Sequence, residues 1–229
     1  MGLARRIRRL RKRKEEDAGK RRRKVLLEPL EPRLLLSADL SYTMSGAADD
    51  LTLLLDNSDG VEILKLIDND DLSILASQAL AETSAVEITG SGDADSFTID
   101  PGLGNLLETL PISFLDSSGG DGDTLKILGH ETTWNITGAD AGFAGSVDFF
   151  GVENLHGGPD NADTFVFQEG GSLSGVIEGG DAGFDSLFIE GGTFAAVAFS
   201  AAGPDSGSIE LNGNLISYSG LEPITLSGV

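Results

Sequence analysis

The sequence predicts an all-β protein, a parallel β-solenoid preceded by a basic leader. Glycine is frequent, with 31 in 229 residues, while aromatic residues make up only 6%, a composition typical of short strands joined by tight turns. From Leu51 onward, apolar-rich runs bounded by Gly, Asp, Asn and Ser recur roughly every ten to twenty residues. Four of these runs also share one internal pattern, which indicates a repeat architecture.

Charge divides the chain into two parts. Fourteen of the 16 Lys and Arg residues lie within the first 33 positions, whereas 32 of the 37 Asp and Glu residues follow them. So acidic a body repels nucleic acid and attracts divalent cations. Cysteine is absent, which excludes disulfides, thiol nucleophiles and Cys-ligated zinc.

Residues 1–24 form the basic leader. Leu3, Ile7 and Leu10 stand at the spacing that places three side chains on one face of a helix. Two interpretations stay open: a short amphipathic helix that contacts an anionic membrane, nucleic acid or the export machinery, and a disordered segment kept open by like-charge repulsion.

Residues 25–39 contain two tandem Leu-Glu-Pro units, three leucines and Ser-Ala-Asp. The apolar run Leu34–Leu36 is too short for a secretory h-region, which needs about seven to fifteen residues. Residues Leu30–Leu36 instead resemble the LEPR-XLL segment of very large repetitive bacterial exoproteins. The resemblance implies a sorting or processing segment and a secreted or cell-surface location, and the small residues Ser37 and Ala38 suggest cleavage after Ala38.

Residues 40–229 form the predicted acidic solenoid region. Four segments in it combine glycines, an acidic loop and Asp-Ser or Asp-Thr with a following strand. They are Ile88–Ile99, Gly119–Ile127, Leu155–Phe167 and Ile177–Ile189. Glycines permit a sharp corner, and apolar residues at i and i+2 of the strand point inward together. Stacked units of this kind would bury a continuous narrow core.

The four segments resemble the calcium-binding nonapeptide repeat of RTX toxins and adhesins, G-G-x-G-x-D-x-U-x. They depart from it in spacing, since the second has one residue too few before its final Asp and the third and fourth have one too many. Oxygen-rich loops suit Ca²⁺, but the same acids could cap turns and keep the surface soluble. The candidate ligands are Asp93, Asp95, Asp121, Asp123, Asp160, Asp163, Asp181 and Asp185.

A second resemblance covers roughly residues 112–190. It rests on Thr133–Gly142, Phe150–Gly158 and Asp163–Phe167, which together are similar to a module common in large bacterial surface proteins. The resemblance implies an extracellular scaffold and brings no catalytic residues. Trp134 within it is expected in the core.

Enzyme signatures are lacking in the sequence: there is no G-x-S-x-G elbow, P-loop, dinucleotide fingerprint or His-Glu-x-x-His. The predicted function is therefore non-enzymatic, a structural or adhesive module of an exported bacterial surface protein with an extracellular surface or carbohydrate as its target. The alternative is a β-helix enzyme acting on polysaccharides, a lyase or hydrolase, because paired acids suit that chemistry. Acids gathered on one face would favour the enzyme, and acids confined to turns would favour the scaffold.

Overall fold

The computed structural model describes residues 37–227 except 118, 193–196 and 212. The basic leader at 1–24, and the LEPR-XLL-like segment up to residue 36, lie outside the described residues. The first strand begins at Ala38, so cleavage after Ala38 would leave all but one of its residues in place.

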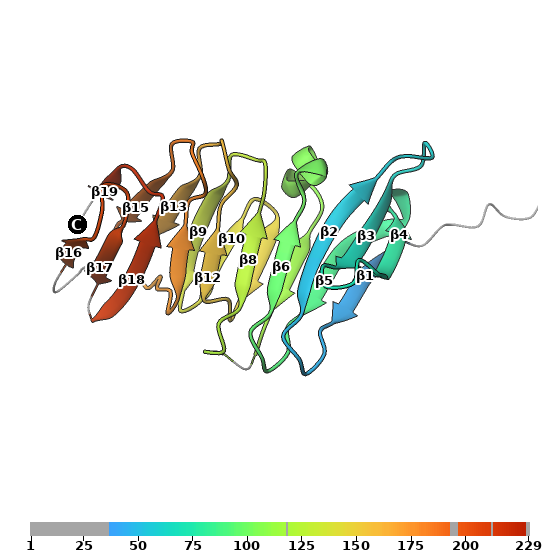
Figure 1. Cartoon of the computed structure of the whole chain (residues 1–229), viewed down its shortest axis with the longest axis horizontal. Helices are drawn as coiled ribbons and strands as arrows, with labels where there is room; N and C mark the ends of the chain where they lie inside the picture. The colour runs from blue at the N-terminus through green and yellow to red at the C-terminus, as the bar shows by residue number, and fades with distance from the viewer. Residues whose placement is uncertain (1–36, 118, 193–196, 212, 228–229) are drawn as a thin grey trace, which may run out of the picture. The chain divides into compact units, whose positions relative to one another are not determined.

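Nineteen strands form two sheets in this part of the chain, and Figure 1 shows one sheet in front of the other. Sheet A has the order β1 (Ala38–Thr43), β5 (Thr83–Thr89), β7 (Ile112–Leu115), β11 (Val147–Phe150), β10 (Ala141–Ala144), β9 (Thr133–Gly138), β13 (Thr164–Phe167), β15 (Ser186–Glu190) and β19 (Ile224–Ser227). Sheet B has the order β16 (Val197–Ala201), β17 (Gly207–Leu211), β18 (Asn214–Ser219), β14 (Val176–Glu178), β12 (Asn154–His156), β8 (Thr124–Ile127), β6 (Ser96–Ile99), β2 (Asp50–Asp56), β3 (Ile63–Asp68) and β4 (Ile74–Ala79). The all-β prediction is confirmed.

The chain passes back and forth between the two sheets. Strands that follow one another within a sheet after such a passage pair in parallel, as β5 does with β7 and β6 with β8. Three antiparallel meanders interrupt this pattern: β2–β3–β4 and β16–β17–β18 in sheet B, and β9–β10–β11 in sheet A. Both sheets are therefore mixed. We call one strand in each sheet, with the loops that join them, a circuit.

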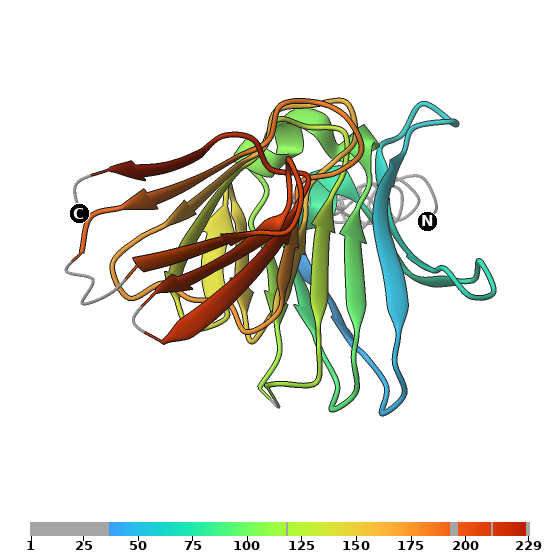
Figure 2. The same cartoon turned by 60° about the vertical axis from the view of Figure 1, so that its left-hand side comes forward.

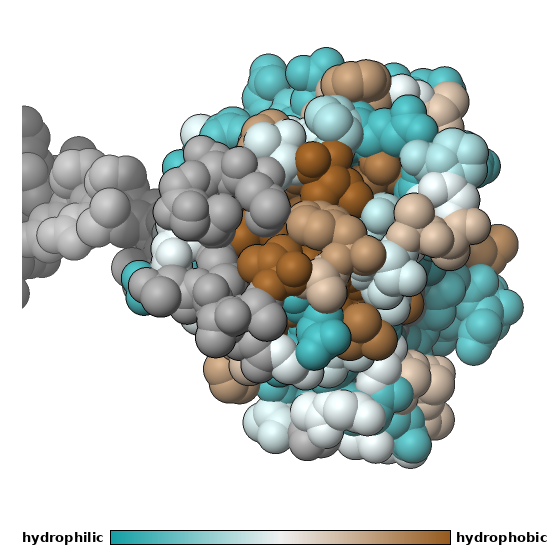
Figure 3. Space-filling model, turned by 90° about the vertical axis from the view of Figure 1, so that its left-hand side faces the viewer, coloured by the Kyte–Doolittle hydropathy of each residue, from teal (hydrophilic) through white to brown (hydrophobic). Residues whose placement is uncertain are grey.

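A single apolar core lies between the sheets, which Figure 2 shows as separate layers. Strand β8 illustrates the inward alternation, because Leu125 and Ile127 are buried while Thr124 and Lys126 are only half-buried. Trp134 is fully buried, as the sequence predicted. At the end of the stack that carries β16 and β19, apolar side chains are seen in the middle of the face (Figure 3).

Two 3₁₀ helices complete the described elements, η1 (Leu80–Glu82) and η2 (Pro101–Glu108). The first is a single short turn between β4 and β5. The second was not expected; it begins where the Asp100 carboxylate accepts a hydrogen bond from the Gly102 N–H at 2.7 Å, with Pro at the first helical position. Within the described residues, no helix is long and apolar enough to cross a membrane.

Two sets of loops follow from this topology. The loops that lead from sheet A to sheet B we call the A-to-B loops; they are β1–β2, β5–β6, β7–β8, β11–β12, β13–β14 and β15–β16. The loops that lead from sheet B to sheet A we call the B-to-A loops; they are β4–β5, β6–β7, β8–β9, β12–β13, β14–β15 and β18–β19. All eight predicted ligand residues lie in these loops.

Candidate metal centre

The final Asp of each repeated unit is buried. Asp95, Asp123, Asp163 and Asp185 expose 1%, 0%, 0% and 3% of their surface. The earlier Asp of each unit lies nearer to solvent: Asp121 is half-buried, and Asp93, Asp160 and Asp181 are exposed. The two acids of each unit therefore have different environments although their sequence contexts are similar.

A ladder of carboxylates connects the A-to-B loops. The Asp49 N–H donates to Asp95 Oδ1, and the Asp95 N–H donates to Asp123 Oδ1, both at 2.8 Å. The Asp123 N–H donates in turn to Glu153 Oε2 at 2.8 Å. Each carboxylate thus binds the backbone of the circuit before it, which satisfies an amide that would otherwise be buried without a partner.

The B-to-A loops carry a second ladder of the same kind. The Thr132 N–H donates to Asp163 Oδ1 and the Asp163 N–H donates to Asp185 Oδ1, both at 2.7 Å. Asp163 Oδ2 also accepts from the Gly158 N–H at 2.9 Å. The first two repeated units belong to one ladder and the last two to the other, so the structure brings together Asp95 with Asp123 and Asp163 with Asp185.

Burial raises the pKa values of Asp123, Asp163 and Asp185. Loss of hydration, partly offset by the hydrogen bond from Asp95 and reinforced by neighbouring carboxylates, raises the pKa of Asp123 to about 7. Loss of hydration also raises the pKa of Asp163 to about 6, against the lowering effect of its backbone donors. The pKa of Asp185 is raised for the same reason.

One group of three acids could hold a metal ion. Oxygens of Asp116, Asp121 and Asp123 lie within 4.8 Å of one another, and this is the one such group among the described residues. Asp116 follows β7 directly and is 3% exposed, with Oδ2 accepting from the Gly119 N–H at 3.0 Å. Asp123 Oδ2 is buried and has no hydrogen-bond partner in the described part of the chain.

The backbone around this group is held by Glu153 and shaped by a glycine. The two Glu153 oxygens accept from the N–H groups of Gly120 at 2.7 Å and of Asp123 at 2.8 Å. A Cβ at Gly90, in the neighbouring A-to-B loop, would lie 3.1 Å from Asp116 Oδ1 and 3.2 Å from Asp123 Oδ2. The absence of a side chain at Gly90 therefore leaves room between two of the carboxylates.

Positive side chains are scarce around these acids. Two lysines, Lys65 and Lys126, and no arginine lie between residues 37 and 227. Lys65 pairs with Asp56, and the other ion pair found in the described residues, between His156 and Glu178 at 3.9 Å, involves strands of sheet B. Neither pair includes a carboxylate of the two ladders.

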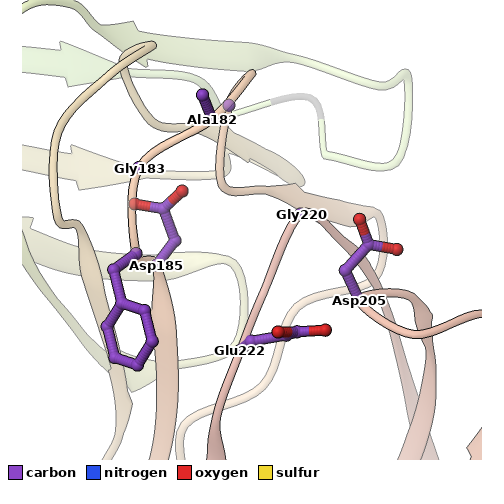
Figure 4. A pocket seen from close by; sticks show the side chains of 8 residues that line it. Ala182, Gly183, Asp185, Asp205, Gly220 and Glu222 are labelled. Carbon is purple, nitrogen blue, oxygen red and sulfur yellow. The ribbon is translucent and has the colours of Figure 1, made fainter.

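A separate pocket of about 200 Å³ lies on the B-to-A side, lined by Asp185, Asp205 and Glu222 with several glycines (Figure 4). Asp185 comes from the β14–β15 loop, Asp205 from the β16–β17 loop and Glu222 from the β18–β19 loop. Their carboxyl oxygens do not meet the spacing of a three-ligand metal group. The pocket is acidic and shallow.

Sequence reasoning missed Asp116 and Glu153. Asp116 lies before the Gly-Gly pair that begins the second repeated unit, so it falls outside the pattern from which the candidate ligands were predicted. Glu153 stands directly before β12 as Asp123 stands directly before β8, so an acid directly before a strand was a signal that could have identified Glu153.

No family model, no curated protein and no solved structure matches this chain. The similarity to LEPR-XLL exoproteins and to RTX repeats therefore stays a prediction from the sequence.

Proposed function

We propose that this chain is a structural or adhesive module of an exported bacterial surface protein. In this proposal residues 40–229 form a parallel β-solenoid with three inserted meanders, and residues 1–39 direct export and processing. The module presents an extracellular surface to a partner such as a carbohydrate, and Ca²⁺ is the ion that stabilises its acidic loops.

The position of the acids is the observation that carries this proposal. The final Asp residues of all four units are buried in corner loops, where they bind backbone amides of neighbouring circuits. Carboxylates used in this way stabilise the contacts between neighbouring circuits. Such a chain is suited to serve as an extended scaffold, because each circuit contacts mainly its neighbouring circuits.

A polysaccharide-active enzyme is the second candidate, and one observation favours it. Asp185, Asp205 and Glu222 share a pocket, and two carboxyl groups flanking a glycosidic bond are the usual requirement for its hydrolysis. However, Asp185 already accepts the Asp163 N–H, and the described residues offer no arginine and only two lysines with which to hold an acidic sugar.

Localisation in a bacterial host tests the scaffold role. We expect the full chain, carrying a C-terminal epitope tag, to reach the medium or the cell surface, and a chain that lacks residues 1–39 to stay inside. Retention of both chains in the cell would overturn the export part of the proposal. Release of reducing ends from polysaccharides by the full chain, lost in Glu222→Gln, would favour the enzyme instead.

A further inference from the structure

We infer that Asp116, Asp121 and Asp123 form a single calcium site in the β7–β8 loop. The inference deepens the calcium part of the proposed function and names its ligands. It differs from the repeat pattern in the sequence, because all three acids belong to one loop and Asp116 lies outside the repeated unit.

An unsatisfied oxygen points to a missing ligand. Asp123 is fully buried, and its Oδ1 accepts the Asp95 N–H while its Oδ2 has no hydrogen-bond partner among the described residues. A buried carboxylate oxygen without a donor or cation is costly. The Oδ2 atom and Asp116 Oδ1 both lie within 3.2 Å of the space that a Cβ of Gly90 would fill, so the free oxygen faces the second acid across a gap.

The buried negative charge around the β7–β8 loop favours a bound cation. Asp95, Asp116, Asp123 and Glu153 are each at least 97% buried, and Asp121 is half-buried beside them. The ion pairs found in the described residues join Lys65 to Asp56 and His156 to Glu178, and neither involves Asp95, Asp123 or Glu153. Buried charges in proteins are paired or coordinate metals, and hard oxygen ligands favour Ca²⁺ or Mg²⁺.

The type of ligand favours Ca²⁺. The three carboxyl oxygens all lie within 4.8 Å of one another, close enough for one calcium ion with bonds of about 2.3–2.6 Å to reach all three. Bonds to Mg²⁺ are about 2.0–2.1 Å and demand near-octahedral geometry. Backbone carbonyls and water can complete the larger shell.

The other acidic loops do not repeat this arrangement. Asp163 uses Oδ1 for Thr132 and Oδ2 for Gly158, so both of its oxygens are occupied by backbone donors. No second group of three carboxylates with the required spacing occurs in the described residues. We therefore expect one ion per chain and not one ion per repeated unit.

Calorimetric titration of the full chain with CaCl₂ tests the site. We expect one ion per chain with a dissociation constant of about 10⁻⁴–10⁻³ M, the range of extracellular modules, and a rise of a few degrees in melting temperature relative to EGTA. Asp121→Asn should weaken binding at least about tenfold, because the amide keeps one oxygen but removes the negative charge of the ligand. Asp116→Asn should do the same while an oxygen remains for the Gly119 N–H.

Asp181→Asn is the matched control, since Asp181 holds a similar place in the fourth unit and is exposed. It should bind Ca²⁺ as the unchanged chain does. Absence of heat up to 10 mM CaCl₂, unchanged binding in Asp121→Asn, a stoichiometry of two or more, or equal binding of MgCl₂ would each overturn the inference. A chain that reaches the cell surface but binds no Ca²⁺ would contradict this site and leave the scaffold role standing.

Discussion

Trp134 and Phe165 stack with their ring planes 9° apart and their centroids 5.6 Å apart. They lie directly opposite each other on β9 and β13, which pair in parallel. Both side chains are fully buried. Phe149 packs edge-on against the same indole, with the two ring centroids 6.3 Å apart. This aromatic cluster joins the β9–β11 meander to the strand that follows it in sheet A.

The two rings should differ in their tolerance of substitution. Phe165→Ala leaves a cavity and should lower the free energy of unfolding by about 3–5 kcal/mol. Trp134→Phe should cost only about 1–2 kcal/mol, because it keeps an aromatic ring and removes an indole N–H that has no hydrogen-bond partner among the described residues. Urea unfolding followed by far-UV circular dichroism measures both, and equal losses would contradict the stacked arrangement.

Asp163→Asn tests the cap in the B-to-A ladder. An asparagine has a single acceptor oxygen, so one of the N–H groups of Thr132 and Gly158 would face an amide donor, and we expect a loss of about 1–3 kcal/mol. Asp160→Asn is the control, because Asp160 is exposed and asparagine tolerates its positive φ of 57°. The control should change stability by no more than about 0.5 kcal/mol in the same urea titration. A similar loss in both variants would show that the cap is not what the substitution removes.

The raised pKa of Asp163 predicts a pH dependence of stability. Because the folded state holds this proton up to about pH 6 and the unfolded state releases it near pH 3.8, the contribution of Asp163 is largest below that window and falls as pH rises through it. In buffer with EDTA, the stability advantage of the unchanged chain over Asp163→Asn should shrink between about pH 4 and pH 6. An advantage that grows with pH would contradict the assigned direction.

Close approach between circuits makes Gly157 intolerant of a side chain. A Cβ there would lie 2.2 Å from Asp163 Oδ2 and 2.4 Å from the Gly179 carbonyl oxygen. Gly157→Ala should therefore lower the free energy of unfolding by about 2–3 kcal/mol. Gly92→Ala, at a position with open space and no positive φ, should be nearly neutral; thermal unfolding of both checks this, and a neutral Gly157→Ala would disprove the close packing.

Local sequence predicted the strands well where alternation was strong. The strand that closes the second repeated segment, Thr124–Ile127, coincides with β8, because its apolar Leu125 and Ile127 alternate with polar residues after a glycine-rich turn. Strand β10 was not predicted, since Ala-Gly-Phe-Ala has little strand preference and pairs only because β9 and β11 flank it. Tertiary context decides such short segments.

The candidate site was only partly predictable for a related reason. Asp123 and Asp163 have the same sequence context, since each is followed by Thr and a short strand. The strand after Asp123 belongs to sheet B, however, and the strand after Asp163 belongs to sheet A. Nothing local records which sheet a strand joins. The closeness of Asp116 to Asp123 depends on how the intervening loop folds back, and spacing alone does not fix that path.

The direction of the carboxylate ladders has a consequence for the order in which the molecule assembles. In each rung the oxygen comes from the later circuit and the amide from the earlier one, as with Asp123 and Asp95 or Asp185 and Asp163. In a chain that emerges from the ribosome N-terminus first, the backbone amides of each circuit can therefore be capped only after the next circuit has been synthesised. We expect assembly to proceed stepwise from the N-terminal strands, with the newest turn always the least stable part of the growing stack.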